Sequence, residues 1–276
     1  MRRLLGEGRT VTRTVVATAA VAPVMASGSV RAEQVTQLVL GELADLLGTE
    51  GEWCHIRTEL DGYEGWVNAG YVQPLSADEA EAWRRSATGW SEGARVSVGR
   101  DVVALPLRAR VALQDGLVTL PDGRAGRIID GEVREGEPAA ASARSTTPHA
   151  WALEHFRGSP YQWGGVTPWG VDCSGLVQTT FAARGIILPR DSSKQAGAGE
   201  AVPLDAIEPG DLLFFRSETG AHITHVAIAA EDGRIVHSTI SCGGVLEEPF
   251  GPGSRAGSAL RPRLVGARRI REGSGR

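Results

Sequence analysis

The stretch GVDCSGLVQTTF, residues 170–181, places a cysteine between an aspartate and a serine, directly before an apolar run. The apolar residues of this run recur at the spacing of one helix face, and Gly185 follows its end. We therefore predict a helix that begins near Cys173, with Asp172 close to its N-cap. The residues on the predicted buried face are Leu176, Val177, Thr180 and Phe181.

Cys173, in the first turn of that helix, has two interpretations. The free N–H groups and the dipole of a helix start favour an anion, which would lower the thiol pKa and prepare a nucleophile. A first-turn cysteine is also a common small core residue. The two interpretations can be distinguished by the neighbours of Cys173, because a nucleophilic thiol needs a base close to it.

Two histidines flank a predicted hairpin further along the chain. Its strands, 224–230 and 234–240, are separated by Glu231-Asp232-Gly233, and three-residue loops with glycine in the left-handed position are common. With that loop, His225 and His237 lie on one face as diagonal neighbours, roughly 7–8 Å apart at the backbone. A two-residue loop would place them on opposite faces.

This arrangement predicts a catalytic triad. Cys173 would be the nucleophile, His225 the base, and His237 the group that holds the tautomer of His225. Two alternatives stay open: each histidine satisfies a local structural need, or the three residues bind zinc. Cys54, by contrast, shares a strand face with Ile56 and is predicted to be a core residue.

The chain as a whole has 276 residues, 42% of them hydrophobic, and a net charge of −4. This length allows two or three small domains with their own cores. Since no basic run or run of 18 apolar residues occurs, we expect neither nucleic acid nor a membrane as partner. Three cysteines form no disulfide framework, and at least one free thiol favours a reducing compartment.

The N-terminal segment 15–27 also has two interpretations. Its Val24-Met25-Ala26 could pass for a signal-peptidase site. Charged residues precede the apolar stretch, and Thr18 and Pro23 interrupt it. We favour a β-strand of alternating small residues.

Short strand patterns broken by Asp-Gly turns in 38–75 and 95–130 predict two small β-barrels. Ser76 and Glu79 have capping-box spacing, which predicts a short helix between the barrels. The stretch 136–149 is small, polar and without periodicity, as in a linker. The predicted divisions are a first barrel (1–75), a connecting helix (76–88), a second barrel (89–135), a linker (136–148) and an α+β domain (149–271).

Residues 155–250 resemble the NlpC/p60 family of cysteine peptidases, which cleave peptidoglycan stem peptides. The segments that carry the resemblance are SPYQWGGVTPWGVDCSGLVQTTF, LPRDSSKQ, EPGDLLFF and THVAIAAEDGRIVHST, in this order. The resemblance implies a papain-like fold, in which a helix carrying the cysteine packs on a small antiparallel sheet carrying the histidines.

The resemblance also implies roles for individual residues. The family's nucleophile, base and third polar residue fall on Cys173, His225 and His237. Tyr161 would sit near the oxyanion, beside the backbone N–H of Cys173. Trp163, which shares the family's Tyr-x-Trp-Gly-Gly motif with Tyr161, is an implied substrate contact. Ser174 and Ser192 are implied to bind the substrate α-carboxylate. Asp191, with Arg190, would either touch the substrate or brace its own loop.

The first half resembles bacterial SH3-like domains, with 95–130 as a weaker second copy. Two such domains before an NlpC/p60 domain resemble dipeptidyl-peptidases that recycle cell-wall peptides, in which the first SH3-like domain closes one end of the cleft. The resemblance places the ligands of a free N-terminal L-alanine amine at Glu42, Tyr63 and Asp172. An ammonium taken into a cleft needs such partners, because an unpaired buried charge is costly.

These observations predict two small SH3-like β-barrels followed by an α+β papain-like catalytic domain. The expected reaction is hydrolysis of the γ-D-glutamyl–diamino acid bond of stem peptides with a free N-terminal L-Ala. It would release L-Ala-γ-D-Glu for murein peptide recycling, without metal or organic cofactor. We expect a monomer, and a cytoplasmic one because signal cleavage after Ala26 would cut into the first barrel.

Three alternatives remain. One is a secreted hydrolase acting on intact peptidoglycan, and another is a non-catalytic wall-binding protein. The third is an acyltransferase or amidase on the same fold, which would need an apolar acyl channel.

Overall fold

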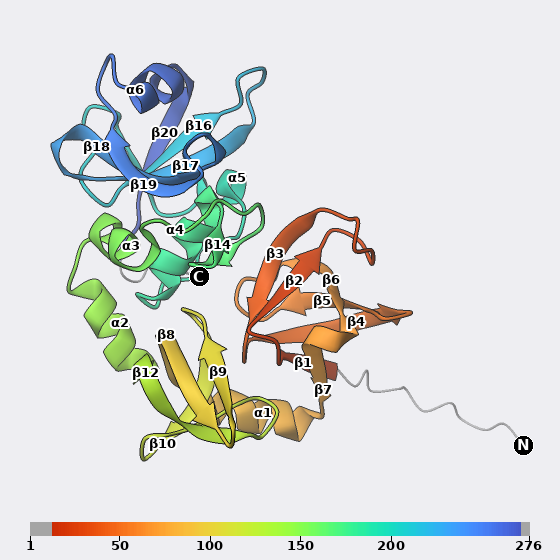
Figure 1. Cartoon of the computed structure of the whole chain (residues 1–276). Coiled ribbons are helices and arrows are strands. Elements are labelled where there is room, and N and C mark those ends of the chain that lie inside the picture. Colours follow the sequence, from red (N-terminus) through yellow and green to blue (C-terminus); the bar gives the residue numbers. More distant parts are fainter. Residues whose placement is uncertain (1–12, 272–276) are drawn as a thin grey trace, which may run out of the picture.

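The computed structural model describes residues 13–271, which form three units packed side by side (Figure 1). The first unit is an antiparallel sheet with strand order β3-β2-β6-β5-β4-β1-β7. Residues 1–12 of the predicted first domain lie outside the described residues. The strands are β1 (Arg13–Ala17), β2 (Val21–Met25), β3 (Gln34–Val39), β4 (Leu43–Glu50), β5 (Trp53–Thr58), β6 (Glu64–Asn68) and β7 (Val72–Leu75).

Strands β1 and β2 overlap the N-terminal segment 15–27, for which the sequence allowed either a signal-peptidase site or a β-strand. β1 pairs with β4 and β7, and β2 pairs with β3 and β6, so both are integral to the sheet. Ala22 and Val24 alternate into the barrel core, together with Cys54 and Ile56 of β5. The predictions of a strand in this segment and of a core position for Cys54 are confirmed.

The second unit is a five-stranded barrel. Its strand order is β10-β11-β12-β8-β9, and β10 also pairs with β8, which closes the sheet. Helix α1 (Ala77–Ser86) precedes it and begins with the predicted capping box of Ser76 and Glu79. The strands are β8 (Gly89–Val98), β9 (Asp101–Leu105), β10 (Arg110–Gln114), β11 (Leu117–Thr119) and β12 (Ala125–Glu135).

The segment predicted to be a linker is instead largely a helix, α2 (Gly136–Arg144). Ala139, Ala140 and Ala143 are buried on one side of it, and two of them join the core of the third unit. Alanine is the best helix former, and its small side chain lets a helix lie close to its neighbours. Because the buried residues of α2 are alanines among other small residues, the segment shows no hydrophobic periodicity that would predict this helix.

The third unit is an α+β domain built on a six-stranded antiparallel sheet, β15-β20-β16-β17-β18-β19. Helices α3 (Pro148–Phe156) and α4 (Cys173–Ala182) pack on one face of the sheet, and α6 (Arg255–Leu260) packs on the other. The other elements are β13 (Val166–Thr167), β14 (Gly170–Val171), α5 (Ser192–Gln195), β15 (Glu200–Val202), β16 (Leu212–Arg216), β17 (Ile223–Ala229), β18 (Arg234–Thr239), β19 (Gly244–Pro249) and β20 (Leu264–Arg269).

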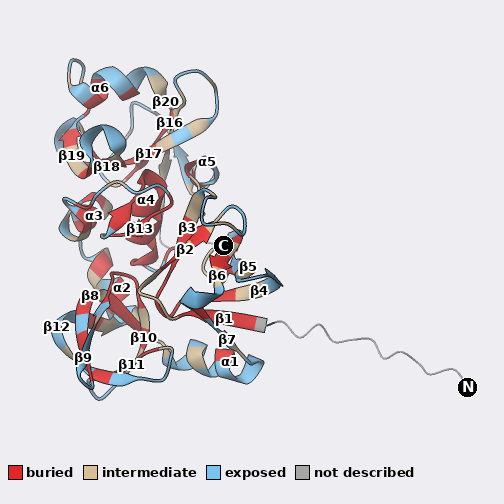
Figure 2. Ribbon diagram, turned by 45° about the vertical axis from the view of Figure 1, so that its right-hand side comes forward, coloured by how far each residue is buried: buried red, intermediate tan, exposed pale blue. Residues whose placement is uncertain are grey.

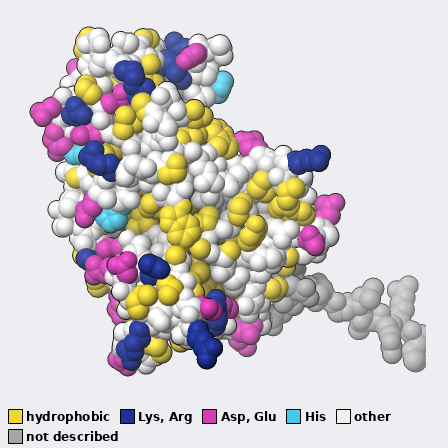
Figure 3. All heavy atoms as spheres, viewed as in Figure 1, with side chains coloured by type: hydrophobic (Ala, Val, Ile, Leu, Met, Phe, Trp, Pro, Cys, Tyr) yellow, Lys and Arg dark blue, Asp and Glu magenta, His cyan; other side chains and the backbone are white. Residues whose placement is uncertain are grey.

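Two of the cores take in residues from neighbouring units. The core around α4 includes Trp90 and Leu107 of the second barrel, and the core of that barrel includes Leu40 of the first barrel and Val166 of the third unit. Figure 2 shows α4 buried along its length. On the face seen in Figure 3, hydrophobic side chains gather where the units meet, and charged ones lie mainly nearer the edges. The barrels are thus fixed relative to the helix that carries Cys173.

Within residues 13–271, no helix is long and apolar enough to cross a membrane.

Candidate active site

Helix α4 begins at Cys173, as predicted, and Asp172 is its N-cap. The Asp172 carboxylate accepts hydrogen bonds from the backbone N–H of Gly175 at 2.7 Å and of Gly164 at 2.8 Å. A Cβ at position 175 would lie 2.0 Å from the Gly165 carbonyl oxygen, so only glycine lets the first turn approach this loop. These contacts hold Cys173, which is 7% exposed, at the base of a cleft.

The histidine hairpin has the predicted register. Ile228 pairs with Val236 and Ala229 with Ile235, around a three-residue loop in which Asp232 and Gly233 have positive φ. His225 Nε2 consequently lies 2.8 Å from His237 Nδ1. The prediction that the two histidines share a face and contact each other is confirmed.

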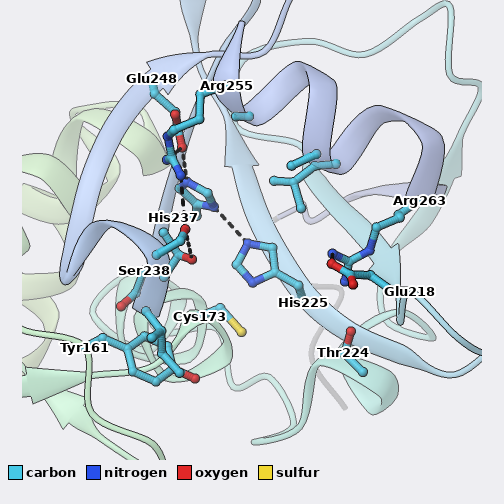
Figure 4. Close-up of a pocket in the computed structure, with 16 residues that line it drawn as sticks. Tyr161, Cys173, Glu218, Thr224, His225, His237, Ser238, Glu248, Arg255 and Arg263 are labelled. Atoms are coloured by element: carbon cyan, nitrogen blue, oxygen red, sulfur yellow. Dashed lines mark hydrogen bonds and ion pairs between the residues drawn. The ribbon is translucent and has the colours of Figure 1, made fainter.

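The histidine pair continues to Glu248, which the sequence analysis missed. His237 Nε2 lies 2.7 Å from Glu248 Oε1, and the buried Glu248 carboxylate also accepts from Arg255 (Figure 4). Glu248 pairs with Ile235 on the next strand, so it is a diagonal neighbour of His237 on the same face. The alternation of side chains along a strand at 244–249 is the feature of the sequence that could have indicated Glu248.

Glu248 fixes the protons of both rings. An ionised carboxylate only accepts hydrogen bonds, so His237 Nε2 carries the proton and His237 Nδ1 accepts. His225 Nε2–H must then donate to His237, which leaves His225 Nδ1 unprotonated. Figure 4 shows His225 and Cys173 on adjacent walls of the cleft. The free nitrogen is therefore the one available to serve as base.

Burial sets the charge state of the catalytic pair. It raises the pKa of the Cys173 thiol to about 12, helped by the Asp172 carboxylate and opposed by backbone N–H groups. Burial also lowers the pKa of His225 to about 3, helped by electrostatic interactions with His237 and Arg263. The N–H group of Ser174 at the helix start does lower the Cys173 pKa, as expected, but desolvation outweighs it and the net shift is upward. Both groups are neutral near pH 7.

Alkylation of Cys173 by iodoacetamide is expected to accelerate with pH up to at least pH 9, without a plateau near neutrality. Below a raised pKa, the thiolate fraction grows about tenfold per pH unit. Mass spectrometry of the peptide containing Cys173 measures this rate, with exposed Cys242 monitored in the same sample. A constant rate between pH 5 and 8 would reveal a thiolate–imidazolium pair and contradict the neutral resting state.

Two cavities meet at Cys173 and Thr224. Among residues 13–271, the larger, about 550 Å³, is lined by the third unit alone, with Tyr161, His225 and His237 in its wall. The smaller, about 360 Å³, is lined in part by Glu33, Val35 and Tyr63 of the first barrel. A substrate that crosses the thiol would occupy both cavities and would meet the first barrel in the smaller one.

The structure brings most predicted substrate contacts to the smaller cavity. Its lining includes Tyr63, Trp163, Asp172, Ser174, Asp191 and Ser192. The Tyr63 hydroxyl donates to Asp191 at 3.2 Å. Burial and the Asp191 charge raise the pKa of Tyr63 to about 12, so it stays a hydrogen-bond donor. Tyr161 lines the larger cavity beside Cys173, and burial raises its pKa too.

Glu42 does not reach the cleft, which corrects its predicted role. Its buried carboxylate accepts from Arg108 Nε at 2.5 Å and from the Val39 backbone N–H at 3.0 Å. Arg108 belongs to the second barrel and also donates to Gln178 and Thr179 of α4, each at 3.3 Å. Glu42 therefore joins the three units at a buried junction.

Glu33 is the acidic residue of the first barrel that lines the smaller cavity. Its carboxylate accepts from Trp163 Nε1 at 2.7 Å, and the neighbouring Gln34 donates to the Trp163 carbonyl oxygen at 2.8 Å. Glu33 precedes β3, whereas Glu42 follows it, so the two glutamates lie at opposite ends of that strand. A six-residue strand spans about 20 Å, which is why only one of them can face the cleft.

Asp172 is already paired. Arg190, 2% exposed, binds both of its carboxylate oxygens at 2.6 and 3.0 Å and also donates to the Ser174 hydroxyl at 2.8 Å. A bidentate pair of this kind fixes geometry and neutralises charge. Asp172 and Arg190 therefore hold the floor of the smaller cavity, and the unpaired negative charge of the cavity comes from the first barrel.

The zinc alternative is not favoured by this geometry, because three of the four ring nitrogens of the histidine pair are engaged in the relay to Glu248. Among residues 13–271, no group of three His, Cys, Asp or Glu side chains is placed to hold a metal ion.

A buried thiol at a helix start, facing a histidine oriented by a second polar residue on an adjacent sheet, defines a cysteine peptidase of the papain-like class. Comparison with known proteins gives the family. The NlpC/P60 family model matches residues 158–256, and that of the bacterial dipeptidyl-peptidase Sh3 domain matches residues 24–70.

Curated relatives extend over most of the chain. The γ-D-glutamyl-L-lysine dipeptidyl-peptidase of Bacillus subtilis is 30% identical over 218 residues, covering 74% of this chain and 71% of that protein. The protein of the same name from Bacillus cereus is 28% identical over 229 residues, covering 74% and 66%. This chain therefore belongs to the NlpC/P60 family of cysteine peptidases, which act on peptidoglycan-derived peptides.

A solved structure has the same fold. The NlpC/P60 family protein from Bacillus cereus superposes with a TM-score of 0.75 at 21% identity, covering 93% of this chain and 99% of that one. The predicted fold class and family are confirmed.

Proposed function

We propose that this protein is a dipeptidyl-peptidase that hydrolyses the γ-D-glutamyl–diamino acid bond of stem peptides with a free N-terminal L-Ala. The product would be L-Ala-γ-D-Glu. The names of the two Bacillus relatives support this assignment. The diamino acid would be lysine or diaminopimelate.

The observation that carries the proposal is the asymmetry of the two cavities. Glu33, Val35 and Tyr63 of the first barrel line the smaller one, whereas the larger one is lined, among residues 13–271, by the third unit alone. A peptide with its amino end against the barrel would place a bond near its start at Cys173. The extent of the peptide beyond that bond is not restricted by the barrel.

The smaller cavity offers partners for both ends of L-Ala-γ-D-Glu. Glu33 supplies unpaired negative charge for the free amine. Asp191, which accepts from the Tyr63 hydroxyl and is paired with Lys194 at 3.7 Å, lines the same cavity. Ser174 and Ser192 line the same cavity, and Ser192 would donate to the α-carboxylate of D-Glu. The Ser174 hydroxyl, which donates to Asp172 at 3.2 Å, would turn toward the substrate to do the same. Trp163, 57% exposed, would cover the alanine end.

The reaction follows from the proton positions. As the Cys173 sulfur attacks the γ-carbonyl carbon, His225 Nδ1 takes the thiol proton, and Glu248 stabilises the resulting imidazolium through His237. The Tyr161 hydroxyl and the Cys173 backbone N–H would stabilise the oxyanion. His225 then protonates the departing amine. Water attacks the thioester with His225 as base and releases L-Ala-γ-D-Glu.

We further propose that the protein works in the cytoplasm in murein peptide recycling. Two observations support this. The amine-binding cavity suits peptides already released from the glycan, since muramic acid would block the alanine amine. Removal of residues up to Ala26 would also delete β1 and β2, which supply buried residues to the first barrel.

The test compares L-Ala-γ-D-Glu-meso-diaminopimelate with the same peptide N-acetylated at alanine. The wild-type protein is expected to release L-Ala-γ-D-Glu from the free peptide and to cleave the acetylated one much more slowly. Glu33→Gln should reduce this preference roughly 30-fold, the value of one charge-assisted hydrogen bond. Mass spectrometry quantifies both products.

The matched control is Glu64→Gln, an exposed first-barrel glutamate paired with Arg57, which should keep the wild-type preference. Equal cleavage of free and acetylated peptides by the wild type would contradict the amine-binding cavity. Release of peptides from intact sacculi at a comparable rate would favour the secreted hydrolase.

A further inference from the structure

Beyond the thiol, the larger cavity carries a fixed pair of opposite charges. Arg263 and Glu218 line it on the side of Thr224 and His225, and their Nη1 and Oε1 atoms are 3.3 Å apart (Figure 4). Arg263 comes from the segment before β20, and Glu218 from the loop between β16 and β17. The pair belongs to no step of the reaction described above.

The guanidinium is positioned for a ligand. Arg263 Nε donates to the Arg216 carbonyl oxygen at 2.8 Å, which holds the side chain at 19% exposure. Within residues 13–271, the hydrogen bonds of Arg263 use Nε and Nη1, so Nη2 is left to bind a further acceptor. Glu218 is 81% exposed and can turn without breaking a buried contact. The Arg263 guanidinium is therefore fixed in place, whereas the Glu218 carboxylate can move to meet a ligand.

The other charged pair of this cavity is committed elsewhere. Glu248 accepts from both His237 and Arg255, and Arg255 also donates to the Ser241 hydroxyl at 3.0 Å. A ligand carboxylate that displaced Glu248 from Arg255 would disturb the histidine relay. Arg263 is the arginine in this cavity that can bind a substrate carboxylate without that cost.

We propose that Arg263 and Glu218 bind the zwitterionic distal end of a diaminopimelate residue on the leaving side of the scissile bond. Arg263 binds the distal carboxylate, and Glu218 binds the ammonium on the same carbon. Lysine ends in an ammonium alone and leaves the guanidinium without a partner. This inference rests on the proposed function and selects diaminopimelate-type over lysine-type stem peptides.

The experiment measures kcat/KM for three L-Ala-γ-D-Glu-X tripeptides, in which X is meso-diaminopimelate, the same residue amidated at its distal carboxyl, or L-lysine. The wild type should prefer the free carboxylate over the amide about tenfold, as expected for one charge-assisted pair at a partly exposed site. In Arg263→Gln this ratio should fall to within about twofold of unity. Arg271→Gln, an exposed arginine outside the cleft, should keep the wild-type ratio.

Because each ratio compares two substrates on one enzyme preparation, partial loss of folded protein cancels. A wild-type enzyme that cleaves all three substrates equally would overturn the inference while leaving the proposed function intact. A preference that survives in Arg263→Gln would do the same. Absence of cleavage of all three tripeptides would overturn the proposed function, and this inference with it.

Discussion

Cys173→Ala is expected to abolish peptide cleavage, with a loss of at least about 10⁴-fold in kcat/KM. The substitution removes the nucleophile but keeps a good helix former at the first position of α4. The Asp172 cap does not involve the thiol, so the fold should be retained. Tripeptide cleavage followed by mass spectrometry measures the loss.

The matched control is Cys242→Ala, which changes an exposed cysteine and should leave kcat/KM within about twofold of wild type. Residual activity of Cys173→Ala above a few per cent of wild type would show that another group attacks the substrate. The account of the site would then fail, whatever the stability of the variant.

Glu248→Met is expected to lower kcat/KM roughly 10²–10³-fold, the usual value of a group that holds a general base in its working tautomer. Methionine has similar length but accepts no strong hydrogen bond. His237 Nε2 then loses its acceptor, so His237 is free to carry its proton on Nδ1. That proton would face His225 Nε2–H and displace the proton of His225 to Nδ1, the nitrogen needed as base.

Two further variants separate this positioning role from a structural one. Glu248→Gln keeps an acceptor oxygen for His237 and should stay within about tenfold of wild type. Glu247→Met changes the neighbouring residue, which is paired with Arg234, and should leave kcat nearly unchanged. Equal losses for Glu248→Gln and Glu248→Met, at similar melting temperatures, would show that the acceptor geometry is not what matters.

Local rules predicted the catalytic centre well. The cap at Asp172 followed from helix periodicity, and the approach of His225 to His237 followed from the loop length of a single hairpin. Both features depend on residues within about 15 positions of each other, where backbone geometry leaves few choices. The same register argument, carried one strand further, would have reached Glu248.

The errors came from contacts between units. The sequence predicts Glu42 in the cleft, but a buried Arg108 from the second barrel binds it. The predicted linker is instead the helix α2, because its burial depends on packing against the third unit. The raised pKa of Cys173 likewise reflects how completely the assembled domain covers the thiol. None of these follows from local periodicity, since each depends on residues distant in sequence.

The central claim is that the first barrel fixes the amino end of the substrate, so that the cleaved bond always lies two residues from that end. The most direct measurement compares wild-type cleavage of the tripeptide, of a tetrapeptide extended by D-Ala, and of the tripeptide extended by one glycine before L-Ala. We predict cleavage after D-Glu in the first two at similar rates and none in the third. Cleavage of the glycine-extended peptide at the same bond, at the same rate, would contradict the claim.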